Sequence, residues 1–107
     1  MSNLNPKFKG MLSLAMKAGK LKIGEGRAQD TIRNDEAYLI ILSSDASDNT
    51  QKKFSDMGSY RDIPVIRPCD RYELGSTIGR EFAVVIAVSD SGFAGSLLKA
   101  APRFNLS

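Results

Sequence analysis

Two long apolar segments constrain the fold of this chain more than any other feature of its sequence. Residues 37–42 (AYLIIL) and 82–88 (FAVVIAV) contain no charged side chain, no glycine and no proline. A strand with one wet face alternates apolar and polar residues, whereas a strand covered on both faces is apolar throughout. We therefore predict two central strands, each buried between two layers of helices.

The segments around these strands carry helix signals. Asp48 with Gln51 and Asp70 with Glu73 resemble capping boxes at helix starts, and Gly19 is placed as a helix stop. In the first half of the chain, the predicted elements are a helix from 5–6 to 19, a short strand from 20, a helix to about 34 and the strand 37–42. They are followed by a helix from 48 to about 58, an edge or short strand 65–66 between prolines, a helix from 70 to 79, the strand 82–88 and a last helix after 92. This order predicts one α/β domain over residues 1–107, a three-layer α/β/α sandwich around a four-stranded mixed sheet.

Composition narrows the function classes. Cys69 is the single cysteine and the chain has no histidine, so we expect no intramolecular disulfide, no structural zinc and no cofactor. The absence of histidine also removes the commonest general base, which argues against an enzyme. We expect a cytoplasmic protein, because residues 1–6 lack signal-peptide features and no apolar run approaches the roughly 20 residues of a membrane span.

The positive charge is concentrated at one end of the sequence. Residues 1–33 contain seven Lys or Arg against two acidic residues, whereas the rest contains eight against ten. Within this basic part, residues 20–33 (KLKIGEGRAQDTIR) predict a strand that passes through glycines into a helix. Such a helix start combines free backbone N–H groups, the positive end of the helix dipole and cationic side chains. It would suit a phosphate backbone, although a charge run alone can also be a solvated face.

Two catalytic or nucleotide-binding alternatives use other residues. Gly24 and Gly26 begin a dinucleotide fingerprint, but its third glycine position is Gln29, and no P-loop triplet is present. Asp45 and Asp90 follow the two central strands, where open α/β sheets place ligands, and could hold a metal ion as a pair. Both are more simply interpreted as turn or capping residues.

A second loop, residues 79–82 (GREF), lies between the predicted fourth helix and fourth strand. We expect it to lie beside the basic helix start, so that the two form a cationic groove edged by Phe82. Phe82 would then be an apolar wedge for RNA, which is recognised by shape, backbone and unstacked bases. The simpler interpretation, which we favour from sequence, makes Phe82 the first core residue of its strand.

The chain resembles the L-seven-Ae ribosomal-protein family of kink-turn RNA binders, and within it the bacterial YlxQ branch. The resemblance covers nearly the whole chain. It lies in residues 14–21 (LAMKAGKL), 24–25, 32–33, 45–47 (DAS) with 49–50 (NT) and 52–53 (KK), 74–75 (LG) with 78–79 (IG), and 88–90 (VSD) with 92–94 (GFA). It implies an α/β/α sandwich that binds structured RNA without catalysis. Family members carry Gly-x-Asn-Glu-x-x-Lys at the second helix start. Here the glycine falls on Gly24, whereas the other three positions are Gly26, Arg27 and Asp30.

We therefore expect a ribosome-associated RNA-binding protein whose partner is structured RNA, and ribosomal RNA in particular. Ribosomal or translation-factor proteins are further candidate partners. The predicted RNA-facing residues are Lys20, Lys22, Gly24, Glu25, Gly26, Arg27, Arg33 and Arg80. The alternative is a protein–protein interaction module of the translation or transcription machinery without direct RNA contact.

Overall fold

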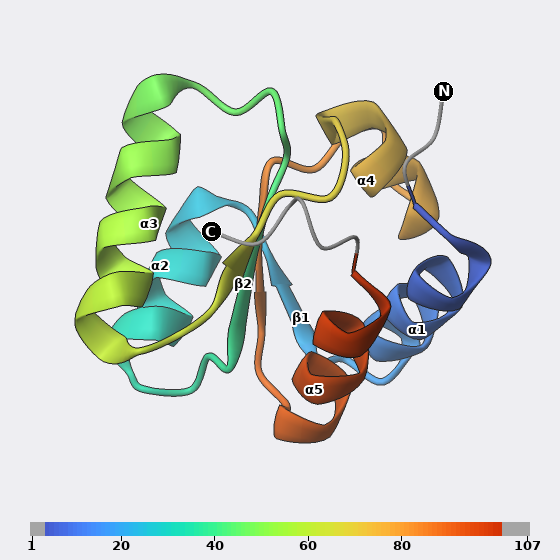
Figure 1. The fold of residues 1–107 in the computed structure, drawn as a ribbon, viewed down its shortest axis with the longest axis horizontal. Helices are drawn as coiled ribbons and strands as arrows, with labels where there is room; N and C mark the ends of the chain where they lie inside the picture. The colour runs from blue at the N-terminus through green and yellow to red at the C-terminus, as the bar shows by residue number, and fades with distance from the viewer. Residues whose placement is uncertain (1–3, 102–107) are drawn as a thin grey trace.

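A computed structural model describes residues 4–101 and confirms the predicted α/β architecture. The nine elements in this part of the chain are α1 Pro6–Lys17, β1 Leu21–Ile23, α2 Glu25–Arg33, β2 Leu39–Leu42, α3 Asp48–Arg61, β3 Val65–Ile66, α4 Arg71–Thr77, β4 Val85–Val88 and α5 Ser91–Ala100. Figure 1 shows three layers: α2 and α3 cover one face of the sheet, and α1, α4 and α5 cover the other.

The sheet is mixed, with strand order β1-β4-β2-β3. β4 runs antiparallel to both β1 and β2, whereas β2 and β3 are parallel. The carboxyl ends of β1, β2 and β3 therefore lie together with the start of β4, at the top of Figure 1. We call this the upper end of the sheet and the opposite one the lower end. Because each of the first three strands leads into a helix, α2, α3 and α4 all begin at the upper end.

The two apolar segments form the centre of the molecule, as predicted. Every residue of β2 and β4 is buried, and the proline-flanked β3 lies at a sheet edge. One side of the sheet packs against Phe8, Leu12 and Leu97 of the α1, α4 and α5 layer. The other packs against Ile32 of α2 and Phe54 of α3. Two separate cores thus hold the sheet rigidly between the helical layers.

Some helix ends follow the sequence signals and others do not. Asn5 caps α1 by accepting from the N–H of Phe8, and Asp70 caps α4. The predicted Asp48–Gln51 box is wrong, because Ser47 is the cap of α3 and Gln51 donates instead to the carbonyl of Ala46. That helix also continues past the predicted stop at residue 58 to Arg61, where the chain leaves through a left-handed Asp62.

The last strand begins three residues later than predicted, at Val85. Residues 79–84 form a loop that is held against α4 by two backbone hydrogen bonds, from Arg80 N–H to the Gly75 carbonyl at 2.9 Å and from Ala83 N–H to the Arg71 carbonyl at 3.0 Å. The loop lies so close that a Cβ on Gly75 would come within 2.4 Å of the Phe82 backbone. These contacts draw Phe82 away from the sheet, so the prediction that it is a core residue of the strand is wrong.

Candidate nucleic-acid interface

The β1–α2 junction is built around a glycine. Gly24 has φ +103 and ψ 154, a conformation that is strained for any residue with a Cβ. Its N–H donates to the carbonyl of Val85 at 2.9 Å, which ties the junction to the start of β4. The first turn of α2 therefore opens directly beside the 79–84 loop, at the upper end of the sheet.

These two segments enclose a groove of about 520 Å³. Its lining consists of Ile23, Gly24, Glu25, Arg80, Glu81, Phe82, Ala83, Val84 and Val85. Phe82 as a residue is 52% exposed, and it supplies an apolar surface to the groove. The two loops therefore lie side by side, as expected from sequence. Phe82 was not among the predicted RNA-facing residues, but it lines the groove.

The start of α2 differs from the starts of the other two helices at this end. Ser47 caps α3 by accepting from Thr50, and Asp70 caps α4 by accepting from two N–H groups. Gly24 gives α2 no side-chain cap. The N–H groups of the first turn, residues 25–27, have no carbonyl partner within the helix, so they remain available to an anion.

The eight predicted residues fall into two groups. Gly24, Glu25 and Arg80 line the groove, and Gly26 and Arg27 are exposed in the adjoining first turn of α2. The remaining three lie away from the groove. Lys20 precedes β1 at the lower end, Lys22 lies within β1, and Arg33 is the last residue of α2.

Strand direction explains this separation. The carbonyl of Lys20 accepts from the N–H of Ser89, beyond the end of β4. Lys22 donates to the Gly19 carbonyl at 3.3 Å, and its side chain lines a second, polar pocket with Glu36. Arg33 is the last residue of α2, which starts at the upper end. The basic residues of the first third therefore do not converge on one face.

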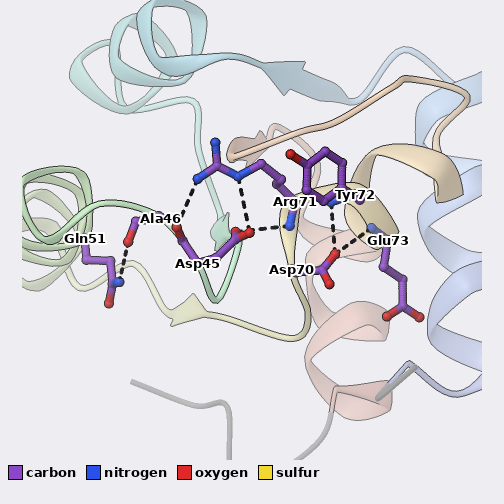
Figure 2. Close-up of polar contacts among 7 residues, drawn as sticks. All are labelled: Asp45, Ala46, Gln51, Asp70, Arg71, Tyr72 and Glu73. Carbon is purple, nitrogen blue, oxygen red and sulfur yellow. Dashed lines mark hydrogen bonds and ion pairs between the residues drawn. The ribbon is translucent and has the colours of Figure 1, made fainter. Parts of the chain in front are cut away.

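Asp45 and Asp90 do not form a pair. Because β2 and β4 are antiparallel, Asp45 lies at the upper end and Asp90 at the lower end, where it caps α5 through the N–H of Phe93. Asp45 instead binds Arg71: it accepts from the Arg71 N–H at 3.1 Å and from Nε at 3.2 Å, and Nη2 donates to the Asp45 carbonyl (Figure 2). The paired-carboxylate metal site considered from sequence does not fit this geometry.

The surroundings of Asp45 also favour its charged form. Partial burial raises the pKa of this carboxyl, but the Ser43 side chain and the hydrogen bonds and charge of Arg71 lower it more, so that the pKa lies below its usual value. The charge of Arg71 is thus largely committed to Asp45. Its guanidinium consequently adds little free positive potential to the upper end.

Comparison with known proteins identifies the class. The family described as "Ribosomal protein L7Ae/L30e/S12e/Gadd45 family" matches residues 6–97, and this chain belongs to it. A relative named RNA-binding protein YlxQ, from Bacillus subtilis (strain 168), is 43% identical over 88 residues, which cover 82% of this chain and 88% of the relative. The resemblance to the YlxQ branch is therefore confirmed.

Solved structures agree on the fold. A protein with unknown function from Bacillus halodurans C has a TM-score of 0.87 and 38% identity, covering 90% of this chain and 97% of that one. The Giardia lamblia 15.5kD RNA binding protein has a TM-score of 0.74 at 16% identity, covering 88% and 84%, and supports the fold alone. Among residues 4–101, no helix is long and apolar enough to cross a membrane.

Proposed function

We propose that this chain is a non-enzymatic RNA-binding protein whose groove at the upper end of the sheet receives folded RNA. The observation that carries the proposal is the combination at one place of an uncapped helix start, the Arg80 guanidinium and the half-exposed Phe82 ring. Membership of a family that includes a relative named RNA-binding protein supports the same conclusion.

Each part of the groove suits a different part of an RNA. The free N–H groups of residues 25–27 suit phosphate oxygens, and Arg27 in the same turn and Arg80 in the groove add positive charge. The Phe82 ring offers a stacking surface for an unpaired base, which folded RNA exposes in loops and bulges. A groove of about 520 Å³ has room for such a base.

Specificity should differ from that of relatives with the full Gly-x-Asn-Glu-x-x-Lys sequence. Gly26 and Arg27 replace the Asn and Glu of that motif, and Asp30 replaces the Lys. We propose that the RNA is kink-turn-like or ribosomal, but that replacing the G·A pairs of a kink-turn changes the affinity little. A ribosomal RNA partner would place the protein with the ribosome in the cytoplasm.

Charge reversal at Arg27 tests the proposal. A glutamate in the first turn of α2 suits the helix dipole and should leave the fold intact, but it adds an anion beside the proposed phosphate site. We expect Arg27→Glu to weaken binding of a folded RNA by about 1 to 3 kcal/mol, the scale of a charge-assisted contact.

The matched control is Lys99→Glu, an exposed residue of α5 in the opposite helical layer. It should bind RNA like the parent protein. Arg27→Glu should melt like the parent, whereas Lys99→Glu should be slightly less stable, because a glutamate in the last turn of α5 opposes the helix dipole. The affinity of the parent should also fall steeply with salt, with a logarithmic slope of roughly 0.7 to 0.9 per neutralised phosphate. A flat salt dependence would instead favour docking of a protein partner.

A further inference from the structure

The ionised side chains that line the groove do not add up to a positive site. Arg80 is the cationic residue of the lining, whereas Glu25 and Glu81 bring two carboxylates. A carboxylate beside a phosphate is unfavourable even in the partly screened environment of a protein surface. Since the proposed function needs an anion at this place, a group from outside the lining should compensate for at least one of the two acids.

Lys53 of α3 is that group. Its Nζ lies 3.4 Å from Oε1 of Glu25, and the two residues are 28 positions apart in the sequence. The ammonium also lies 5.7 Å from the centre of the Phe54 ring, whose residue is fully buried. The ring face attracts the cation and helps to hold it at the junction of α2 and α3.

The contact is poorly explained as a device for stability. The side chains of Lys53 and Glu25 are 42% and 51% exposed, and ion pairs of this kind stabilise proteins by about 0 to 1 kcal/mol. Glu25 is the first residue of α2, where the helix dipole favours a carboxylate without any partner. Left unpaired, this carboxylate could turn toward the free N–H groups of its own helix and occupy the place of a phosphate.

We propose that Lys53 is a positioning residue for RNA binding: it engages the Glu25 carboxylate on the α3 side and thereby keeps the first turn of α2 open to phosphate. This inference rests on the proposed function of the groove and adds a residue of α3 to it. Lys53 acts through Glu25, so its contribution depends on the presence of that carboxylate.

The neighbouring lysine provides a matched control. Lys52 carries the same charge on the same helix, but it pairs with Asp56 at 3.1 Å on an outer surface where the two side chains are 79% and 67% exposed. Lys53→Gln should weaken binding of a folded RNA about 5-fold, whereas Lys52→Gln should change it less than about 2-fold. Lys53→Arg keeps the charge and should bind like the parent. Equal effects of Lys52→Gln and Lys53→Gln would overturn the inference.

A double-mutant cycle separates positioning from direct contact. In a Glu25→Gln background, Lys53→Gln should alter RNA affinity less than about 2-fold, because no carboxylate remains to be held. An undiminished loss in that background would mean that Lys53 contacts RNA itself and would overturn the proposal.

Inorganic phosphate gives a second readout that does not need RNA. Titrated into the full chain, phosphate should shift the amide resonances of Gly26 and Arg27, less so in Lys53→Gln and more so in Glu25→Gln. Identical shifts in all three proteins would contradict the positioning role.

If the parent and Arg27→Glu bind folded RNA equally weakly, the proposed function itself fails. If the parent binds RNA tightly but Lys52→Gln and Lys53→Gln behave alike, the role of Lys53 alone fails.

Discussion

The upper and lower ends of the sheet both carry basic residues, but their local structures differ. At the upper end three helices begin, one without a side-chain cap, and a half-exposed aromatic ring lies beside Arg80. Toward the lower end, Lys20 lies just before β1, and Lys22 lies within β1 and lines a polar pocket with the acidic Glu36. The comparison shows that charges clustered in sequence can be divided between the two ends of a sheet by strand direction. It also shows that the groove combines a helix start without a side-chain cap with few lysines.

Two tightly packed glycines, one near each end, give the largest expected effects. A Cβ at Gly75 would meet the Phe82 backbone at 2.4 to 2.7 Å, and a Cβ at Gly58 would meet Val65 Cγ2 at 2.7 Å and the Ile63 carbonyl at 2.8 Å. Each substitution by Ala should lower the free energy of unfolding in urea by about 1 to 3 kcal/mol through overpacking. Only Gly75→Ala should also weaken RNA binding by the folded protein, because it displaces the groove loop. Parent-like affinity in folded Gly75→Ala would argue against that loop as part of the site.

Charge reversal compares the two ends more directly. Arg80→Glu should reduce the affinity for folded RNA by about 1 to 3 kcal/mol, because an anion replaces the cation of the groove. Lys22→Glu makes the same change at the lower end and should have little effect in the same binding assay. If the two variants lose comparable affinity, the RNA surface extends along β1 and the basic cluster predicted from sequence describes it better than the groove does.

A smaller effect distinguishes the two aspartates. The lowered pKa of Asp45 means that its charge stabilises the fold above the usual pKa of about 3.8, and that this stabilisation is lost as the pH falls through the lower folded value. Asp45→Asn should therefore be less stable than the parent at neutral pH, by less than about 1 kcal/mol because both side chains of the Asp45–Arg71 pair are more than one-third exposed. The difference should shrink as the pH falls below the usual pKa of the carboxyl and the parent loses the charge of Asp45. Asp90→Asn should differ little in stability at neutral pH, since Asn caps helices as well as Asp does. Urea unfolding across this pH range measures both.

The parts of the fold that depend on local sequence could be predicted. Continuous apolar character predicted β2 and β4, and a single residue such as Asp70 predicted a helix start, because a cap acts within one turn. The boundary at residue 82 could not be predicted this way. Phe82 continues the apolar run of the strand, and contacts of its loop with α4, the close approach of Gly75 among them, remove it from the sheet.

The candidate site was predictable to the same degree. Gly24 and the open helix start are visible in sequence because glycine, helix and charge are adjacent there. Lys53 was missed as a neighbour of Glu25 because the contact crosses from one helix to another, and no periodicity within either helix indicates it. Lys20 and Lys22 were misplaced relative to the groove because charge density along a chain contains no information about which end of a strand a residue occupies.

The strand order also has a consequence for the timing of folding. β1 is an edge strand whose neighbour is β4, the last strand along the described residues 4–101, and β4 is also the antiparallel neighbour of β2. Such pairing between distant parts of a chain closes large loops and slows folding relative to local pairing. During translation, the groove cannot form until residues 85–88 have been made, because β1 and the start of α2 bind to β4. A nascent chain that stops before residue 85 would therefore carry the basic N-terminal third without the groove. On the proposed function, such a chain would present the basic residues but not the assembled RNA site.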